Sequence, residues 1–405
     1  MSNLYNDGRK KALSHKPVGS SPTSEVRKID PQKTKGLKKK KTWKSLALKI
    51  GLYVLTGIIG LLAGGYSYIS FNILGAVGYT PVDIVSPGDA DVNTPNVKPG
   101  EFDDINVDDT VFQGNTSSSW AEGGHTAVYV DERFPIKEVK QRDPNVQNIL
   151  IFGVDARSTS EVKDSRADAL MIVSLDKNTD SIKLISLMRD TDVVMEGRSS
   201  PDKINHAYKF GGVGLLINTV NENFDLDIQK FVMLDFSSAS GLIDLVGGIP
   251  IEVSPAEVKY ANESINEQNI YLQRYSPFLT NSGLQVLDGI QATAWSRIRM
   301  LDSDFVRTER QRLLADRLIR TVAVQDTLTQ LSVLERGAGM IETNLTQNEL
   351  LQIGTTGIQL VGNIHQYRIP DDGLFVTQRD PWKIIVDWDQ QIPSLHEYIW
   401  GRSYH

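Results

Sequence analysis

The sequence predicts an α/β domain with a central mixed sheet, preceded by a single transmembrane helix. Three observations predict this architecture. An uncharged stretch of 22 residues occupies positions 50–71, short apolar runs alternate with helical patterns after residue 148, and two of those runs read as a hairpin. The hairpin makes the sheet mixed, because hairpin strands are antiparallel whereas strands joined through helices are usually parallel.

Charge is distributed very unevenly along the chain. The 405 residues carry a net charge of −7, yet residues 1–49 hold 14 Lys or Arg and 3 Asp or Glu, a balance of +11. The remainder therefore carries −18, since −7 minus 11 is −18. Such a split predicts two compartments or two partners. The absence of cysteine excludes disulfides, thiolate nucleophiles and cysteine zinc sites.

Residues 50–71 have the length and composition of a membrane span. About 20 apolar residues cross a hydrocarbon core of about 30 Å, and Tyr66 and Tyr68 stand near the far end, where interfacial aromatic residues are favoured. A buried core helix would show a polar face. A cleaved signal peptide would start close to the N-terminus, whereas 49 residues precede this stretch. We therefore expect an uncleaved signal-anchor.

The flanking charges predict the orientation of this span. Six lysines lie within residues 38–49, whereas residues 83–132 contain 11 acidic side chains and one basic one. The positive-inside rule places the N-terminus in the cytoplasm and the rest outside, in a single-pass protein of the cell membrane. A basic tail can also bind nucleic acid or anionic lipid, but it lacks a helix-turn-helix pattern and aromatic interleaving, so a nucleic-acid partner is disfavoured.

The chain divides into four predicted parts. Residues 1–49 form a basic cytoplasmic tail that we expect to be disordered, 50–71 the transmembrane helix, 72–147 an acidic extracellular stalk, and 148–405 the extracellular domain. Within that domain we expect strands at 148–154, 169–175, 181–187, 230–236 and 249–253, and helices at 213–223, 237–247, 287–296 and 304–323.

The first polar cluster follows the first predicted strand. Asp155 comes directly after that strand, and Arg166 and Asp168 precede the next one. Ligands of open α/β sheets bind beyond the carboxyl ends of strands. Two carboxylates there suit a hard divalent cation such as Mg²⁺, which uses few protein oxygens and completes its shell with water and phosphate. Asp at a strand end is also a common turn former or N-cap.

The second cluster is Arg189 and Asp190, after the second hairpin strand. Arg166 and Asp168 precede the first hairpin strand, so the antiparallel arrangement brings Arg189 to the same rim as Asp168. The alternative is a surface ion pair between Arg189 and Asp190, which stabilises little.

The third cluster is the stretch SRIRMLDSDFVRTERQ. Arg297 and Arg299 alternate, so in an extended segment they point the same way. Asp304, Arg307 and Gln311 then fall on one face of a helix, with Arg310 one turn from Arg307. Clustered arginines favour a polyanionic ligand, because the planar guanidinium binds phosphate in bidentate fashion. A solvated basic helix face is the alternative.

Together the clusters describe a site for a pyrophosphate. Phosphoryl transfer requires positioning and charge neutralisation more than covalent help from the protein. The sequence contains neither a G-x-x-x-x-G-K-[ST] loop nor an H-E-x-x-H motif, and its six histidines show no metal-ligand spacing.

These residues resemble the LytR–CpsA–Psr family of cell-envelope proteins. The matching stretches are NILIFGVDAR, DSRADALMIVSLD, ISLMRDT, KINHAYKFGG, FVMLDFSSASGLIDLVGGIPIEV and RIRMLDSDFVRTERQ, which cover about residues 148–315 in the family's order. The basic tail, single span and external domain resemble the family as well. The resemblance implies an α-β-α sandwich with an apolar pocket for a polyprenyl chain.

The resemblance also implies an activity and its residues. It implies transfer of an anionic glycopolymer, of teichoic acid or capsule type, from undecaprenyl pyrophosphate to peptidoglycan in a Gram-positive cell envelope. By motif, Asp155 and Asp168 bind Mg²⁺. The pyrophosphate-binding residues are Arg166, Arg189, Arg297, Arg299 and Arg307, and the catalytic set is Arg189, Arg297, Arg299, Asp304, Arg307 and Gln311.

Lys203 and Asn205 match a KIN motif near the site. Apolar pocket candidates, indistinguishable by type from core residues, are Val232, Leu234, Phe236, Leu242 and Leu245.

The sequence departs from the family pattern at two positions. The family usually has Ser where Ala167 stands and Pro where Met188 stands. The first change is small for small and the second loosens a backbone constraint. Neither removes a charged group, so the expected activity is preserved.

The expected reaction begins when a peptidoglycan hydroxyl, by resemblance the C6 hydroxyl of N-acetylmuramic acid, attacks the glycan-side phosphorus. Undecaprenyl phosphate then leaves. No general base is obvious, and Asp155 and Asp304 are both candidates. Two other functions stay open: a hydrolase that uses water as acceptor at the same site, and a membrane-bound transcriptional regulator or attenuator that uses the basic tail.

Overall fold

The computed structural model describes residues 78–80, 82, 84–85, 98, 100, 128–154 and 165–402. All of them belong to a compact unit that spans residues 61–405. The predicted tail, the predicted span at 50–71 and Asp155 lie outside the described residues. Within the described part of the chain, no helix is both long and apolar enough to cross a membrane.

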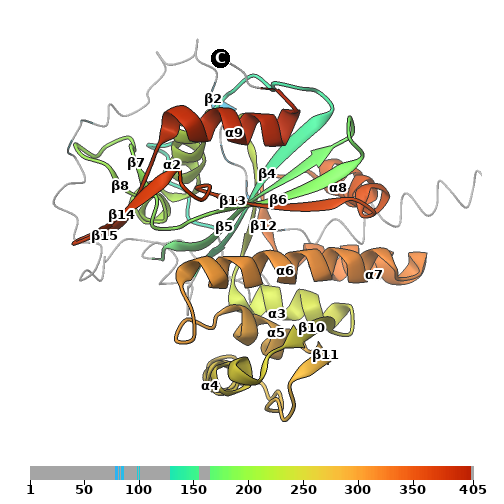
Figure 1. Ribbon diagram of the computed structural model, residues 1–405. Coiled ribbons are helices and arrows are strands. Elements are labelled where there is room, and N and C mark those ends of the chain that lie inside the picture. The colour runs from blue at the N-terminus through green and yellow to red at the C-terminus, as the bar shows by residue number, and fades with distance from the viewer. Residues whose placement is uncertain are drawn as a thin grey trace, which may run out of the picture. The chain divides into compact units, whose positions relative to one another are not determined.

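A seven-stranded sheet forms the centre of the described domain (Figure 1). Its strands are, in spatial order, β1 (Gly78–Tyr79), β12 (Glu342–Thr343), β9 (Lys230–Leu234), β4 (Val146–Val154), β5 (Ala167–Asp176), β6 (Ser181–Leu187) and β13 (Ile364–Ile369). β4, β5 and β6 are antiparallel neighbours, whereas β9 is parallel to β4 and β13 is parallel to β6. The predictions of an α/β fold with a mixed sheet and of the β5–β6 hairpin are therefore confirmed.

The remaining elements are helices and two-stranded pairs. The helices are α2 (His206–Phe224), α3 (Phe236–Leu245), α4 (Pro255–Tyr271), α5 (Gly289–Ser296), α6 (Asp304–Ala323), α7 (Thr327–Ala338), α8 (Gln347–Leu360) and α9 (Trp388–Trp400). The strand pairs outside the sheet are β2 (Ile84–Val85) with β3 (Ile136–Lys137), β7 (Asp192–Val193) with β8 (Asp202–Lys203), β10 (Ile249–Val253) with β11 (Gly283–Leu287), and β14 (Phe375–Arg379) with β15 (Trp382–Val386).

Helices cover both faces of the sheet because its strands alternate apolar residues between the faces. Leu170, Ile172 and Ile185 point to the face that packs against α2 and α9. Leu175 and Leu184 point to the other face, where α6 and α8 supply apolar partners. The sheet is thus the middle layer between two layers of helices (Figure 1).

A second core lies beside the sheet and positions the start of α6. It joins α3, α4 and α5 to the antiparallel pair β10–β11, around Ile243, Ile265 and Trp295. β10 is a strand as predicted, but its partner is β11 and not the main sheet. The extended backbone of Ser303 begins α6 at Asp304, whose carboxylate stands in the first turn, where the helix dipole favours a negative charge.

Residues before 148 contribute to the main core. Phe134 and Ile136 are buried there, although composition places them in the predicted stalk. Gly214 permits this close approach, because a Cβ at that position would stand 1.7 Å from the Phe134 carbonyl oxygen. The lack of a side chain at this glycine therefore lets the segment 128–136 pack closely against α2. Apolar periodicity in the sequence does not reveal this contact.

Candidate active site

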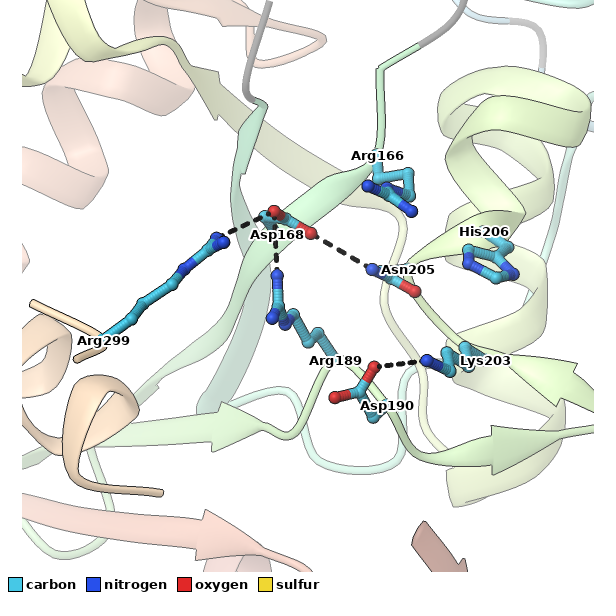
Figure 2. Close-up of a pocket in the computed structure, with 8 residues that line it drawn as sticks. All are labelled: Arg166, Asp168, Arg189, Asp190, Lys203, Asn205, His206 and Arg299. Carbon is cyan, nitrogen blue, oxygen red and sulfur yellow. Dashed lines mark hydrogen bonds and ion pairs between the residues drawn. The ribbon is translucent and has the colours of Figure 1, made fainter. Parts of the chain in front are cut away.

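A polar pocket of about 200 Å³ opens where β5 begins and β6 ends (Figure 2). It is lined by Arg166, Asp168, Arg189, Asp190, Lys203, Asn205, His206 and Arg299. Four of these side chains are cationic and two are carboxylates, so the lining carries a net charge of +2 with His206 neutral. A pocket of this charge suits an anionic ligand.

Asp168 lies at the centre of this pocket because the start of β5 is irregular. Gly153 pairs with Ala169 and Val154 pairs with Ala167, so Asp168 is an extra residue without a partner on β4. Such a β-bulge re-aims a side chain and is common beside active sites. The bulge turns the Asp168 carboxylate toward the arginines that surround it (Figure 2).

Three donors hold the Asp168 carboxylate. Its Oδ2 lies 2.9 Å from Nη1 of Arg189 and 3.3 Å from Nη2 of Arg299, and its Oδ1 accepts a hydrogen bond of 3.1 Å from Asn205 Nδ2. Burial alone would raise the pKa of Asp168, but Arg189, Asn205, Arg299 and Arg166 outweigh burial and hold it below the ordinary value of 3.8. Asp168 is therefore ionised at neutral pH.

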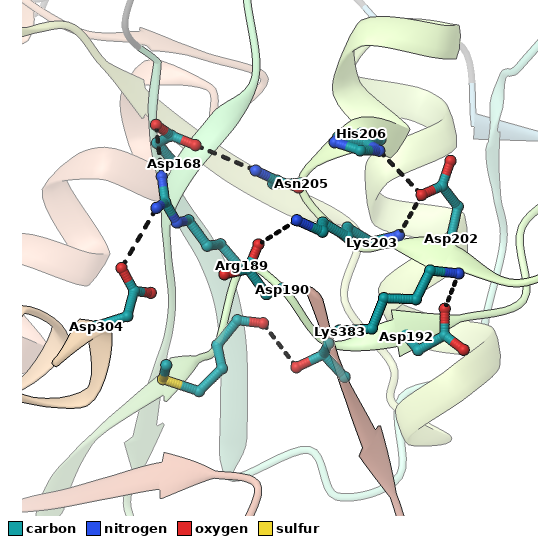
Figure 3. A network of polar contacts seen from close by, with 12 residues as sticks. Asp168, Arg189, Asp190, Asp192, Asp202, Lys203, Asn205, His206, Asp304 and Lys383 are labelled. Carbon is teal, nitrogen blue, oxygen red and sulfur yellow. Dashed lines mark hydrogen bonds and ion pairs between the residues drawn. The ribbon is translucent and has the colours of Figure 1, made fainter. Parts of the chain in front are cut away.

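Arg189 connects this carboxylate to the first turn of α6. Its Nη2 lies 3.4 Å from Oδ1 of Asp304, and Nη2 of Arg307 lies 2.7 Å from the same oxygen. Figure 3 shows Arg189 between Asp168 and Asp304. Two arginines and two carboxylates thus form one chain of ion pairs from β5 to α6.

Arg307 is the most buried cation of this chain. Its side chain is 3% exposed, and its Nε and Nη1 have no hydrogen-bond partner among the described residues. Burial lowers the pKa of Arg307 to about 10, and the positive charges of Arg189 and Arg299 add to this effect although Asp304 opposes it. A buried guanidinium with unused donors is costly, so the arrangement favours arrival of an anion.

The KIN segment completes the pocket on the side opposite Arg299. The backbone N–H of Asn205 donates to the Arg189 carbonyl, and the Asn205 carbonyl accepts from the Ala167 N–H, each at 3.3 Å. These bonds fasten the segment to the strand ends that carry Arg189 and Asp168. Lys203 Nζ lies 3.2 Å from Oδ1 of Asp190 (Figure 2). The predicted role of Lys203 and Asn205 near the site thus has a structural basis.

The structure places several other predicted residues away from the pocket. Arg297 ends α5 in a helical turn, so it does not alternate with Arg299, and its guanidinium lies 4.0 Å from the centroid of the Phe236 ring. Gln311 is half-buried on α6, two turns beyond Asp304, and does not line the pocket. Arg310 pairs with Glu257 at 2.7 Å and with Asp302, so its counter-ions come from the protein.

The sequence did not indicate His206 as a site residue, and it placed Asp190 in the second cluster without a role. Both line the pocket. His206 follows directly on the KIN motif, and its Nδ1 lies 3.0 Å from Oδ1 of Asp202. Its place directly after the KIN motif was the available indication in the sequence.

The donor set limits how a metal can bind. No group of three His, Cys, Asp or Glu side chains with metal-site geometry exists in the described part of the chain. Two carboxylates line the pocket: Asp190 is paired with Lys203, and Asp168 lies among the arginines. That fits Mg²⁺, which often takes one or two carboxylates and completes its shell with water and substrate phosphates. It does not fit a metal held by protein ligands alone.

The fold and the pocket define an α/β domain with an arginine-rich pocket at one edge of a mixed sheet. The profile of the LytR–CpsA–Psr family (LytR_cpsA_psr) matches residues 114–387. The chain therefore belongs to this family.

Relatives and solved structures agree with this assignment. The chain is 30% identical over 246 residues to the polyisoprenyl-teichoic acid–peptidoglycan teichoic acid transferase TagU of Halalkalibacterium halodurans, covering 60% of this chain and 75% of that one. It is 27% identical over 325 residues to TagU of Bacillus cereus strain AH820, covering 80% and 88%. B. subtilis TagT matches in fold with a TM-score of 0.51 at 21% identity, covering 65% of this chain and 94% of TagT. A structure of TagT bound to LI-WTA has a TM-score of 0.52 at the same identity and coverage.

Proposed function

We propose that this protein transfers an anionic glycopolymer, of teichoic acid or capsule type, from undecaprenyl pyrophosphate to peptidoglycan. The observation that carries the proposal is the convergence of Arg189, Arg299 and Arg307 on two carboxylates, with N–H donors of Arg189 and Arg307 left unpaired. The family assignment and the names of the TagU relatives support the choice of donor and acceptor.

The arginines that contact the Asp168 carboxylate can bind a diphosphate in its place. In the ligand-free site, Arg189 and Arg299 both contact Oδ2 of Asp168. A diphosphate offers more oxygens and more charge than one carboxylate, so it competes for the same guanidinium forks. As the bond to the leaving undecaprenyl phosphate breaks, charge grows on that phosphate, and arginines already held in place stabilise it without reorganisation.

Mg²⁺ is part of the proposal. Asp168 would hold the ion, together with Asp155, which lies outside the described residues. Bound there, the ion would supply charge neutralisation at the pyrophosphate. Asn205 keeps the Asp168 carboxylate oriented through Oδ1, and the bulge keeps it turned into the pocket. The hydrogen bond from Asn205 and the bulge position the carboxylate whether or not an arginine contacts its Oδ2.

The polyprenyl chain requires an apolar surface. On β9, Phe231 and Met233 are buried on one face, while Val232 and Leu234 on the other face stay half-buried. Phe236, Leu242 and Leu245 on α3 are also half-buried. Apolar side chains left partly uncovered support an apolar ligand better than a closed core does. A membrane anchor at residues 50–71 would place the domain beside its lipid-linked donor.

The test is a transfer assay with the full chain, labelled undecaprenyl-pyrophosphate-linked polymer and peptidoglycan. We expect label to become attached to peptidoglycan, and Asp168→Ala to lose that activity. Arg402→Ala, an exposed arginine far along the chain, serves as the control and should retain it. Release of free polymer without attachment would instead identify a hydrolase, and unchanged transfer by Asp168→Ala would overturn the role of the carboxylate.

A further inference from the structure

We propose that His206 is the general base that accepts the proton of the attacking hydroxyl, with Asp202 as its positioning residue. The inference rests on the proposed transferase function and names a residue that the reaction otherwise lacks. His206 is the first residue of α2 and lines the same pocket as Asp168, Arg189 and Arg299.

The hydrogen bond to Asp202 fixes the tautomer of His206. A carboxylate only accepts, so the Nδ1 that lies 3.0 Å from Asp202 Oδ1 carries the proton. In neutral imidazole the other nitrogen, Nε2, is then the unprotonated acceptor. Figure 3 shows Asp202 on one side of the ring and Asn205 on the other, and both His206 and Asn205 line the pocket.

Asp202 is itself held firmly in an ionised state. Its Oδ2 lies 3.2 Å from Nη2 of Arg198, and its Oδ1 accepts a hydrogen bond of 2.7 Å from the Lys203 backbone N–H. Burial would raise the pKa of Asp202, but His206, Lys203 and Arg198 hold it below 3.8. A base oriented by a fixed carboxylate is the arrangement by which hydroxyl groups are activated in unrelated enzymes.

The other described carboxylates of the site are poorly suited to this task. Asp168 is bonded to three donors, and Asp190 pairs with Lys203 at 3.2 Å. Asp304 shares its Oδ1 between Arg189 and Arg307. The cations around Asp168 hold its pKa below the ordinary value, which weakens that carboxylate as a proton acceptor, and Asp190 and Asp304 each face a cation of the protein. His206 lies across the pocket from Arg299, which leaves room for the diphosphate between them (Figure 2).

The acceptor hydroxyl gives its proton to Nε2 of His206, and its oxygen forms a bond to the glycan-side phosphorus. The bond from that phosphorus to the bridging oxygen breaks, and undecaprenyl phosphate leaves with the electron pair. The imidazolium, stabilised by Asp202, then returns its proton to water.

The experiment compares His206→Ala, His206→Gln and Asp202→Asn with wild type in the transfer assay, using the full chain. We expect His206→Ala and His206→Gln to lose about 10²–10⁴-fold in kcat with little change in KM for the donor, and Asp202→Asn to lose less. Glutamine retains a polar side chain and the fold, so a loss with normal thermal unfolding is not structural. Added imidazole should restore part of the His206→Ala rate. His365→Ala, an exposed histidine on β13, is the control.

Two results would overturn the assignment of His206. One is transfer by folded His206→Gln within a few-fold of wild type. The other is a loss in His206→Ala that imidazole does not restore at any concentration. Absence of transfer by the wild-type chain itself would count against the proposed function instead, so the two failures are distinguishable.

Discussion

The guanidinium of Arg189 lies 2.9 Å from the carboxylate of Asp168, although the two residues belong to opposite ends of a hairpin in the sequence. The β5–β6 pairing brings them to one rim, and the bulge at Asp168 turns the carboxylate toward the guanidinium.

Replacement by Met should lower the thermal stability of the protein much more at Arg310 than at Arg307. Both are buried on α6, but Arg310 has two carboxylate partners, whereas Arg307 has unpaired Nε and Nη1. Breaking a buried ion pair costs about 3–5 kcal/mol. Arg307 instead carries two buried N–H donors without partners, and Asp304 keeps Arg189 as a counter-ion when Arg307 is replaced. We expect Arg310→Met to lower the melting temperature strongly and Arg307→Met to change it little.

The transfer activity of Arg307→Met separates a functional role from a structural one. Arg307→Met should lose transfer by at least about 100-fold, because it removes a cation that shares Asp304 with Arg189, a residue of the pocket lining. Thermal denaturation and the transfer assay on the same preparations measure both effects. A large loss of stability in Arg307→Met would mean that the residue is structural.

Arg299→Ala should lose activity without losing stability. The Arg299 side chain is 56% exposed, and exposed ion pairs contribute only about 0–1 kcal/mol. Its matched control is Arg402→Ala, because the Arg402 side chain is 59% exposed and its ion pair with Asp143 is 3.5 Å long. Transfer rates should fall by about 100-fold or more for the first and stay unchanged for the second. Equal rates for the two variants would remove Arg299 from the site.

Asp168 should stabilise the fold in a pH-dependent manner. Its pKa in the folded protein lies below 3.8, so the stabilisation is present above that value and disappears as the pH falls through the folded pKa. Wild type should therefore unfold at higher denaturant concentration than Asp168→Asn at pH 7, and the difference should shrink below pH 3.8. Asp372→Asn, at a carboxylate that is 93% exposed, should show little difference at either pH. A gap for Asp168→Asn that widens in acid would contradict the sign of the pKa shift.

The half-buried face of β9 should determine how the rate of transfer depends on the length of the donor's prenyl chain. We expect Leu234→Gln to slow transfer from an undecaprenyl donor more than from a donor with a short prenyl chain, since only the long chain needs that surface. Leu284→Gln, at an apolar residue that is 71% exposed on β11, should affect neither donor. Equal slowing of both donors by Leu234→Gln would mean that Leu234 serves packing alone.

The sequence predicted the parts of this structure that depend on local pattern. The alternation of apolar runs predicted the mixed sheet, and helical spacing predicted α6 at 304–323, which agrees with Asp304–Ala323. It could not show the bulge that turns Asp168, because one extra residue in a strand leaves no mark in the apolar pattern. Arg297 was expected beside Arg299, but the end of α5 continues as a helical turn through Arg297. The sequence also did not reveal the counter-ions of the arginines. Only the structure shows that Glu257, at the start of α4, pairs with Arg310 on α6.

The central claim is that this pocket holds a diphosphate, and a crystal structure with an undecaprenyl-pyrophosphate-linked saccharide tests it most directly. We predict both phosphates within hydrogen-bonding distance of Arg189 and Arg299, with those arginines withdrawn from Oδ2 of Asp168. The contradicting result is a diphosphate bound elsewhere, for example in the pocket of about 310 Å³ that is lined by Gln147, Asn148 and Gln352, with the contacts of Asp168 unchanged.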